Sequence, residues 1–176
     1  MFRGDPGPPP PCPALQILPG ADAISAYAPG RQGEAAGLNY VAGLGDPASA
    51  CRYDGQGVEI DLAFNLLVEQ GPAFDAAPVR LTWFIATVAP GAQIQSKQLF
   101  TSEVIFTEAQ EAAGLREEVT LRVPGVRPDD SARLDVYVGF QLDEASRRPG
   151  QVPLIPSAPS LPPGDPGGAP SPDPAQ

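Results

Sequence analysis

The sequence predicts an all-β protein, a single antiparallel β-sandwich of immunoglobulin-like topology, with a partly open barrel as the alternative. Three observations support this fold class. Seven to nine short apolar runs recur at roughly ten-residue spacing, with Gly, Pro and Asp turns between them. No segment has the pattern and length of a four-turn helix. Prolines concentrate at the two ends, with six of the 24 in residues 6–13 and ten in residues 149–174.

The proline distribution also predicts the domain boundaries. A chain of 176 residues is long enough for one domain with tails. We expect a Pro/Gly-rich leader over residues 1–13, the β-sandwich over 14–145 and a disordered Pro-rich tail over 146–176.

The first half of the domain is predicted to contain short strands separated by turns. The strands are expected at 14–18, 23–28, 38–44 and 49–53. The turns are expected at 19–20, 29–30, 45–47 and 54–57, with a polar connection over 31–37.

Two longer strands follow. Residues 58–66 alternate between apolar and polar side chains, which is typical of a strand with one buried and one wet face. Residues 79–88 are apolar on both faces and predict a central strand, where Trp83 would fill the core between two sheets.

The remaining strands are expected at 93–107, 115–123 and 132–142. Residues 108–114 favour a helix by composition, but seven residues make two turns at most, so we expect a connector there.

Composition excludes several classes of function. The chain has no histidine, which removes the commonest general base, the Ser-His-Asp and Cys-His nucleophile systems and imidazole metal ligands. A formal net charge of -10 argues against binding a nucleic acid backbone. No run of 18 apolar residues predicts a membrane span, and no basic and apolar leader is present, so a chain that starts at Met1 would stay in the cytoplasm. We expect no cofactor and no metal.

Glu59 and Asp61 are candidates for a hydrolase that uses carboxylates alone. They lie two residues apart on the wet side of the 58–66 strand, which separates them by about 7 Å. The alternative, which we favour, is that they solvate this face and keep sheets from associating.

Other polar groups have simpler explanations than a site. Asp129 with Asp130, and Asp54 with Glu59, do not match the spacing of a known calcium loop, and turn chemistry explains them. Ser96 and Lys97 are neighbours on a strand, so their side chains point to opposite faces and cannot form a dyad.

Aromatic residues suggest a second class of function, a carbohydrate-binding module. Large amphipathic rings in strands normally pack at the boundary of the core, which is the interpretation we favour. The residues concerned are Tyr27, Tyr40, Tyr53, Tyr137 and Trp83.

The two cysteines, Cys12 and Cys51, allow three hypotheses. Lipidation of Cys12 is disfavoured because four prolines precede it, and a reactive thiol lacks a positive neighbour. A Cys12–Cys51 disulfide would close a loop of about 40 residues and contribute roughly 4 kcal/mol in the chain-entropy model. We favour the disulfide, which implies an oxidising compartment and conflicts with the missing leader.

Three segments are distinctive: the Pro-Cys-Pro start at 11–13, the CRY segment at 51–53 and the VGFQL strand at 138–142. Through them the chain resembles, over about residues 11–145, uncharacterised envelope proteins and lipoproteins of alphaproteobacteria. Such proteins usually have a signal peptide or lipobox before the Pro-Cys-Pro element, so either the start at Met1 is truncated or mis-assigned, or this copy is not exported. The resemblance implies a periplasmic or envelope location and no catalytic residue.

Together these observations predict a non-catalytic accessory protein outside the cytoplasm, not an enzyme. Its partner would be a protein or a membrane-associated complex, bound through a sheet face or by strand addition at an edge. The carbohydrate-binding module and the hydrolase remain the alternatives.

Overall fold

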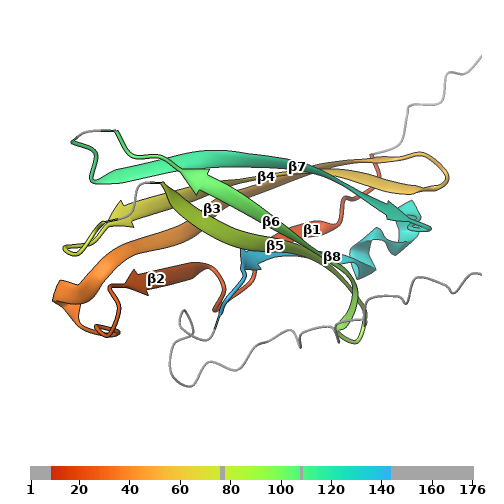
Figure 1. The fold of residues 1–176 in the computed structure, drawn as a ribbon. Coiled ribbons are helices and arrows are strands. Elements are labelled where there is room, and N and C mark those ends of the chain that lie inside the picture. Colours follow the sequence, from red (N-terminus) through yellow and green to blue (C-terminus); the bar gives the residue numbers. More distant parts are fainter. Residues whose placement is uncertain (1–8, 76–77, 108, 144–176) are drawn as a thin grey trace, which may run out of the picture.

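The structure is a computed structural model that describes residues 9–75, 78–107 and 109–143. Within these residues, eight strands form two four-stranded sheets packed face to face (Figure 1). Sheet A contains, in spatial order, β1 (Ala14–Ile17), β8 (Asp135–Phe140), β5 (Val79–Ala89) and β6 (Gln93–Val104). Sheet B contains β2 (Ala23–Tyr27), β3 (Leu38–Tyr53), β4 (Gly57–Gln70) and β7 (Ala112–Pro124). Two short 3₁₀ turns, η1 (Ala35–Gly37) and η2 (Pro128–Arg133), connect strands.

One antiparallel strand pair in each sheet defines the topology of the sandwich. Strand β4 lies beside β7 in sheet B, and β5 lies beside β8 in sheet A. Immunoglobulin-like sandwiches pair their B with E and C with F strands in the same way. The predicted β-sandwich is therefore confirmed, and the structure is not the alternative barrel. The sheets are not wholly antiparallel, however, because β1 runs parallel to β8.

The core lies between the sheets and is supplied mainly by β4 and β5. The predicted alternation in β4 is confirmed and extends beyond residue 66, since all six apolar inward side chains of this strand are buried. They are Val58, Ile60, Leu62, Phe64, Leu66 and Val68. Period-two alternation places these apolar groups on one face, so β4 buries its inner side and leaves the outer side to solvent.

Strand β5 is central, as predicted, and is buried on both faces over residues 83–87, whereas Arg80 and Thr82 are exposed on its outer face. Trp83 points inward, packs edge-on against Phe64 at 4.9 Å between ring centroids and stacks on Phe100 at 4.4 Å. Its indole N–H donates to Ser102 Oγ at 2.7 Å, which satisfies the one polar atom of a buried ring. On the other face Phe84 is also buried, beneath the Lys97 ammonium at 4.4 Å from the ring centroid.

Some predicted boundaries are wrong. Residues 45–47 do not form a turn, because β3 continues from Leu38 to Tyr53. The pairing of β3 with β4 is irregular at these residues. Strand β7 begins at Ala112, so the end of the 108–114 connector is strand, and residues 132–133 belong to η2. The predicted tail over 146–176 and the first eight residues of the leader lie outside the described residues.

Candidate interaction face

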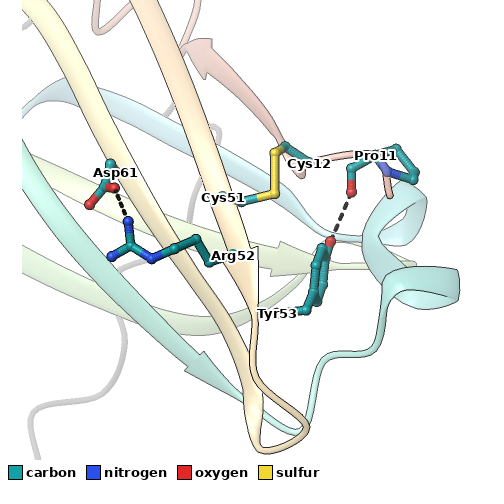
Figure 2. Close-up of a disulfide and its surroundings, with 6 residues drawn as sticks. All are labelled: Pro11, Cys12, Cys51, Arg52, Tyr53 and Asp61. Carbon is teal, nitrogen blue, oxygen red and sulfur yellow. Dashed lines mark hydrogen bonds and ion pairs between the residues drawn. A yellow bond between two sulfur atoms is a disulfide. The ribbon is translucent and has the colours of Figure 1, made fainter. Parts of the chain in front are cut away.

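The predicted disulfide is present and joins the two sheets. Cys12 lies two residues before β1 of sheet A, and Cys51 lies in β3 of sheet B, with Cα atoms 5.6 Å apart (Figure 2). Beside it the Tyr53 hydroxyl donates to the Pro11 carbonyl oxygen at 2.8 Å. The end of the proline run is thus fixed to sheet B at two points before β1 begins.

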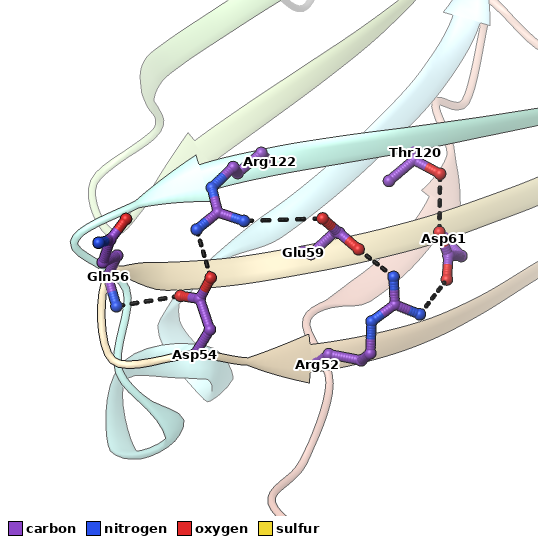
Figure 3. Close-up of polar contacts among 7 residues, drawn as sticks. All are labelled: Arg52, Asp54, Gln56, Glu59, Asp61, Thr120 and Arg122. Atoms are coloured by element: carbon purple, nitrogen blue, oxygen red, sulfur yellow. Dashed lines mark hydrogen bonds and ion pairs between the residues drawn. The ribbon is translucent and has the colours of Figure 1, made fainter.

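Glu59 and Asp61 both lie on the outer face of sheet B, as predicted, and both are bound by Arg52. The Arg52 guanidinium donates to Asp61 at 3.1 Å and to Glu59 (Figure 3). Asp61 also accepts from the Thr120 hydroxyl at 2.7 Å on β7. Both carboxylates therefore accept hydrogen bonds from side chains on the same face of the sheet.

The charge network extends across the strand ends. Arg122 lies 3.6 Å from Glu59 and donates to Asp54, whose other carboxylate oxygen accepts from the Gln56 backbone N–H at 3.0 Å (Figure 3). The bond from Arg122 lowers the pKa of Asp54, and the bond to Glu59 raises the pKa of Arg52. The network therefore consists of ion pairs in which the charged forms of Asp54 and Arg52 are favoured by their partners.

The other predicted polar groups remain apart. Ser96 hydrogen-bonds with Thr87 at 2.9 Å on the inner face of sheet A, whereas Lys97 donates to Gln141 at 2.9 Å on the outer face. Asp129 and Asp130 lie in the first turn of η2. Within the described residues no group of three or more Cys, Asp or Glu side chains is arranged to hold a metal ion.

The aromatic residues do not gather on one exposed face. Trp83 is 1% exposed, and Tyr40 and Tyr53 pack against the core. Tyr27 lies in β2 and is partly buried, while Tyr137 lies in the other sheet, where its neighbour on β5 is Ala86. Burial raises the pKa of Tyr40, with the Asp143 carboxylate as a second cause.

The outer face of sheet B carries a shallow trough, which we call the small-residue face. Its outward positions on β3 carry mostly Gly or Ala, and β4 and β7 each contribute one small residue to the trough among polar side chains, so backbone lies close to solvent at these positions. These positions are Gly43, Gly45, Ala48, Ala50, Ala63 and Gly114. Neither Gly43 nor Gly45 has another atom within 4 Å of where a Cβ would stand. Two depressions of about 520 and 600 Å³ occupy the trough, one above Gly43 and Gly114 and one above Ala48 and Ala63.

A polar bridge lines the first depression, at the row of residues next to the second. Asn65 donates to Asp46 at 2.7 Å and accepts from Arg116 at 3.1 Å, so three neighbouring strands are tied together at this row. Asp46 has a φ of 49° at the irregularity in β3, a left-handed conformation that Asp tolerates better than most residues. The bridge therefore fixes both the irregularity and the shape of the trough.

Sequence reasoning missed the small-residue face. Its signal is a run of Gly and Ala at alternate strand positions, and this becomes visible only when the register places those positions side by side. One exposed apolar side chain, Leu67 at 48%, lies at the end of the trough between Gly43 and Gly114.

No known protein family, curated protein sequence or solved structure matches the chain. In the part of the chain that the structure describes, no helix has the length and apolar character needed to cross a membrane.

Proposed function

We propose that the protein is a non-catalytic accessory module of the bacterial envelope that binds a protein partner through the small-residue face. The observation that supports this is the combination of a bare sheet surface with a fixed polar bridge across it. Apolar side chains of a partner's helix or strand would fill the two depressions, and its polar groups would meet Asp46 and Arg116.

Two observations support a location outside the cytoplasm. The Cys12–Cys51 disulfide is the kind of bond that persists in oxidising compartments. The sequence also resembles alphaproteobacterial envelope proteins over about residues 11–145. Both fit a periplasmic or envelope-attached protein.

The alternatives have less support. A carbohydrate-binding module would use exposed rings, and its best platform, Trp83, is buried in the core. A hydrolase would need a raised pKa on one of two carboxylates in a cleft, whereas Glu59 and Asp61 are ion-paired with Arg52 on an open sheet face.

Photo-crosslinking in native cells tests the proposal. A photoreactive residue at Ala48, inside one depression, should capture a partner as a discrete adduct. The same residue at Thr82, which is exposed on the outer face of sheet A, is the matched control and should give none.

A second variant checks that the adduct depends on the shape of the face. Ala63→Arg fills the depression beside Ala48 and should reduce the adduct at least tenfold, while Thr82→Arg should leave it unchanged. Equal capture from both faces, or an adduct that Ala63→Arg does not weaken, would contradict the proposal.

A further inference from the structure

Strand β6 leaves a long edge unpaired. Within the described residues it pairs with β5 alone and ends sheet A, so one side of its backbone has free N–H and C=O groups. It runs for 12 residues without proline and carries only two charges, Lys97 and Glu103. Leu99 beside them is 58% exposed.

The other edges of the sandwich are shorter or protected. Strands β1 and β2 have four and five residues. Strand β7 is long, but Glu117 points inward from it opposite Phe64, and an inward charge discourages strand addition. The inward positions of β6 are uncharged, which makes it the edge best suited to accept another strand.

We propose that two copies of this chain associate through β6, edge to edge and antiparallel, with Phe100 on the two-fold axis and Lys97 of each copy opposite Glu103 of the other. Sheet A would then continue as one eight-stranded sheet across the dimer. The small-residue faces lie on the other sheet and stay free, so dimerisation is independent of the proposed function.

The sequence of β6 selects this register. In an antiparallel pair about Phe100, residues whose numbers add to 200 stand opposite one another, and 97 plus 103 meets this condition. The same register sets exposed Leu99 against Thr101 and the two half-buried Phe100 rings against each other. Moving the axis to Leu99 would place Lys97 opposite Thr101 and leave both charges without an opposite partner.

The surroundings of Lys97 favour an incoming carboxylate. Its described contacts are the Gln141 amide oxygen and the Phe84 ring, and no carboxylate forms an ion pair with it among the described residues. Partial burial lowers the pKa of Lys97, because desolvation disfavours its charged form. Glu103 is held by Arg80 at 3.0 Å at the strand surface, where it can bridge to a second cation.

Charge exchange on the full chain tests the proposal by sedimentation velocity over a range of concentrations. The native protein should dimerise reversibly and weakly, because a single pair of edges buries little area. Lys97→Glu and Glu103→Lys should each weaken dimerisation by roughly tenfold or more, since each sets like charges opposite one another. The double variant should dimerise like the native protein, and mixing the two single variants should restore a heterodimer.

Matched controls come from the Arg31–Glu34 ion pair, which lies in the loop before β3 and away from β6. Arg31→Glu and Glu34→Lys change the net charge by the same amounts and should leave dimerisation unchanged. Thermal unfolding of every variant shows that each is folded. A native protein that stays monomeric at millimolar concentration overturns the proposal. So does a dimer that the single exchanges do not weaken, or single variants that fail to pair when mixed.

Discussion

The two lateral sides of the sandwich are closed in different ways. On one side, β1 and β3 bring the sheets together through the Cys12–Cys51 disulfide, with apolar Leu15 and Ile17 packed against the core. On the other side, β6 and β7 end their sheets without a covalent link, and polar groups such as Gln98 and Glu117 occupy some of their inward positions among apolar ones. The first side is closed by the disulfide and by buried apolar side chains, whereas the second side is accessible to solvent.

This difference separates stability from association. A four-residue strand such as β1 forms few backbone hydrogen bonds. The disulfide therefore adds stability that so short a strand cannot provide by itself. The long strands β6 and β7 are held well by β5 and β4, and their outer edges remain available. We therefore expect changes on the closed side to alter mainly the free energy of unfolding, and changes at exposed or charged positions of β6 and β7 to alter contacts with other chains.

The largest effect is expected from removing the disulfide. Cys12→Ala with Cys51→Ala should lower the free energy of unfolding by about 4 kcal/mol, because the unfolded chain regains the entropy of a 39-residue separation. Urea denaturation of the oxidised native protein and the double variant measures this difference.

Hydrogen exchange shows where the loss is felt. The Leu18 backbone N–H donates to the Val138 carbonyl at 2.8 Å beside β1 and should exchange faster in the variant, whereas β6 amides paired with β5 should change only with global stability. A variant as stable as the native protein would show that burial alone closes this side.

The second largest effect concerns the core next to the open side. Ser102→Ala leaves the buried Trp83 N–H without its acceptor and should cost about 1–3 kcal/mol. Fluorescence of the single tryptophan follows unfolding directly.

Thr101→Ala is the matched control for this change, since Thr101 is the exposed neighbour on the opposite face of β6. It should cost well under 1 kcal/mol. If both variants lose the same stability, the Trp83–Ser102 bond contributes nothing specific.

The sequence predicts the fold better than the site, for physical reasons. The alternation in 58–66 and the apolar run in 79–88 report burial directly, so β4 and β5 were predicted with their faces correct. The prediction of a Gly-Asp-Pro turn at 45–47 was wrong, because residues typical of turns also occur at irregularities within a strand. Here Asn65 stabilises the irregularity by its hydrogen bond to Asp46.

The cysteine pairing was accessible because the chain has only two cysteines. Neither the parallel pairing of β1 with β8 nor the small-residue face was accessible, since both depend on strands distant in sequence becoming neighbours. Gly43 and Ala63 have no polar side chain that would suggest a site, and only the strand register shows that they lie on the same surface.

The third prediction concerns the inward charge on β7. Glu117→Val should raise the free energy of unfolding by up to about 1 kcal/mol, because a β-branched apolar residue suits a half-buried strand position. It should also increase self-association, measured by light scattering, because the edge loses its charge.

Glu118→Val provides the comparison, as it removes the same charge from the outward side of the same strand. Its side chain is 77% exposed, so it should change neither quantity appreciably. Equal association of both variants would assign the effect to net charge and not to the inward position.

The smallest effect is a dependence of stability on alkaline pH through Lys97. Burial lowers its folded pKa below the ordinary 10.5, so between these two values the unfolded chain binds more protons than the folded one. Stability contributed by this residue therefore rises with pH across that window. The difference in unfolding free energy between native protein and Lys97→Met, measured on dilute protein, should shift in favour of the native protein as pH increases. The raised pKa of Tyr40 acts in the opposite direction but is shared by both proteins and cancels. A difference that moves against the native protein would mean that a carboxylate already compensates Lys97 in the monomer, leaving the β6 edge with less to gain from a second copy.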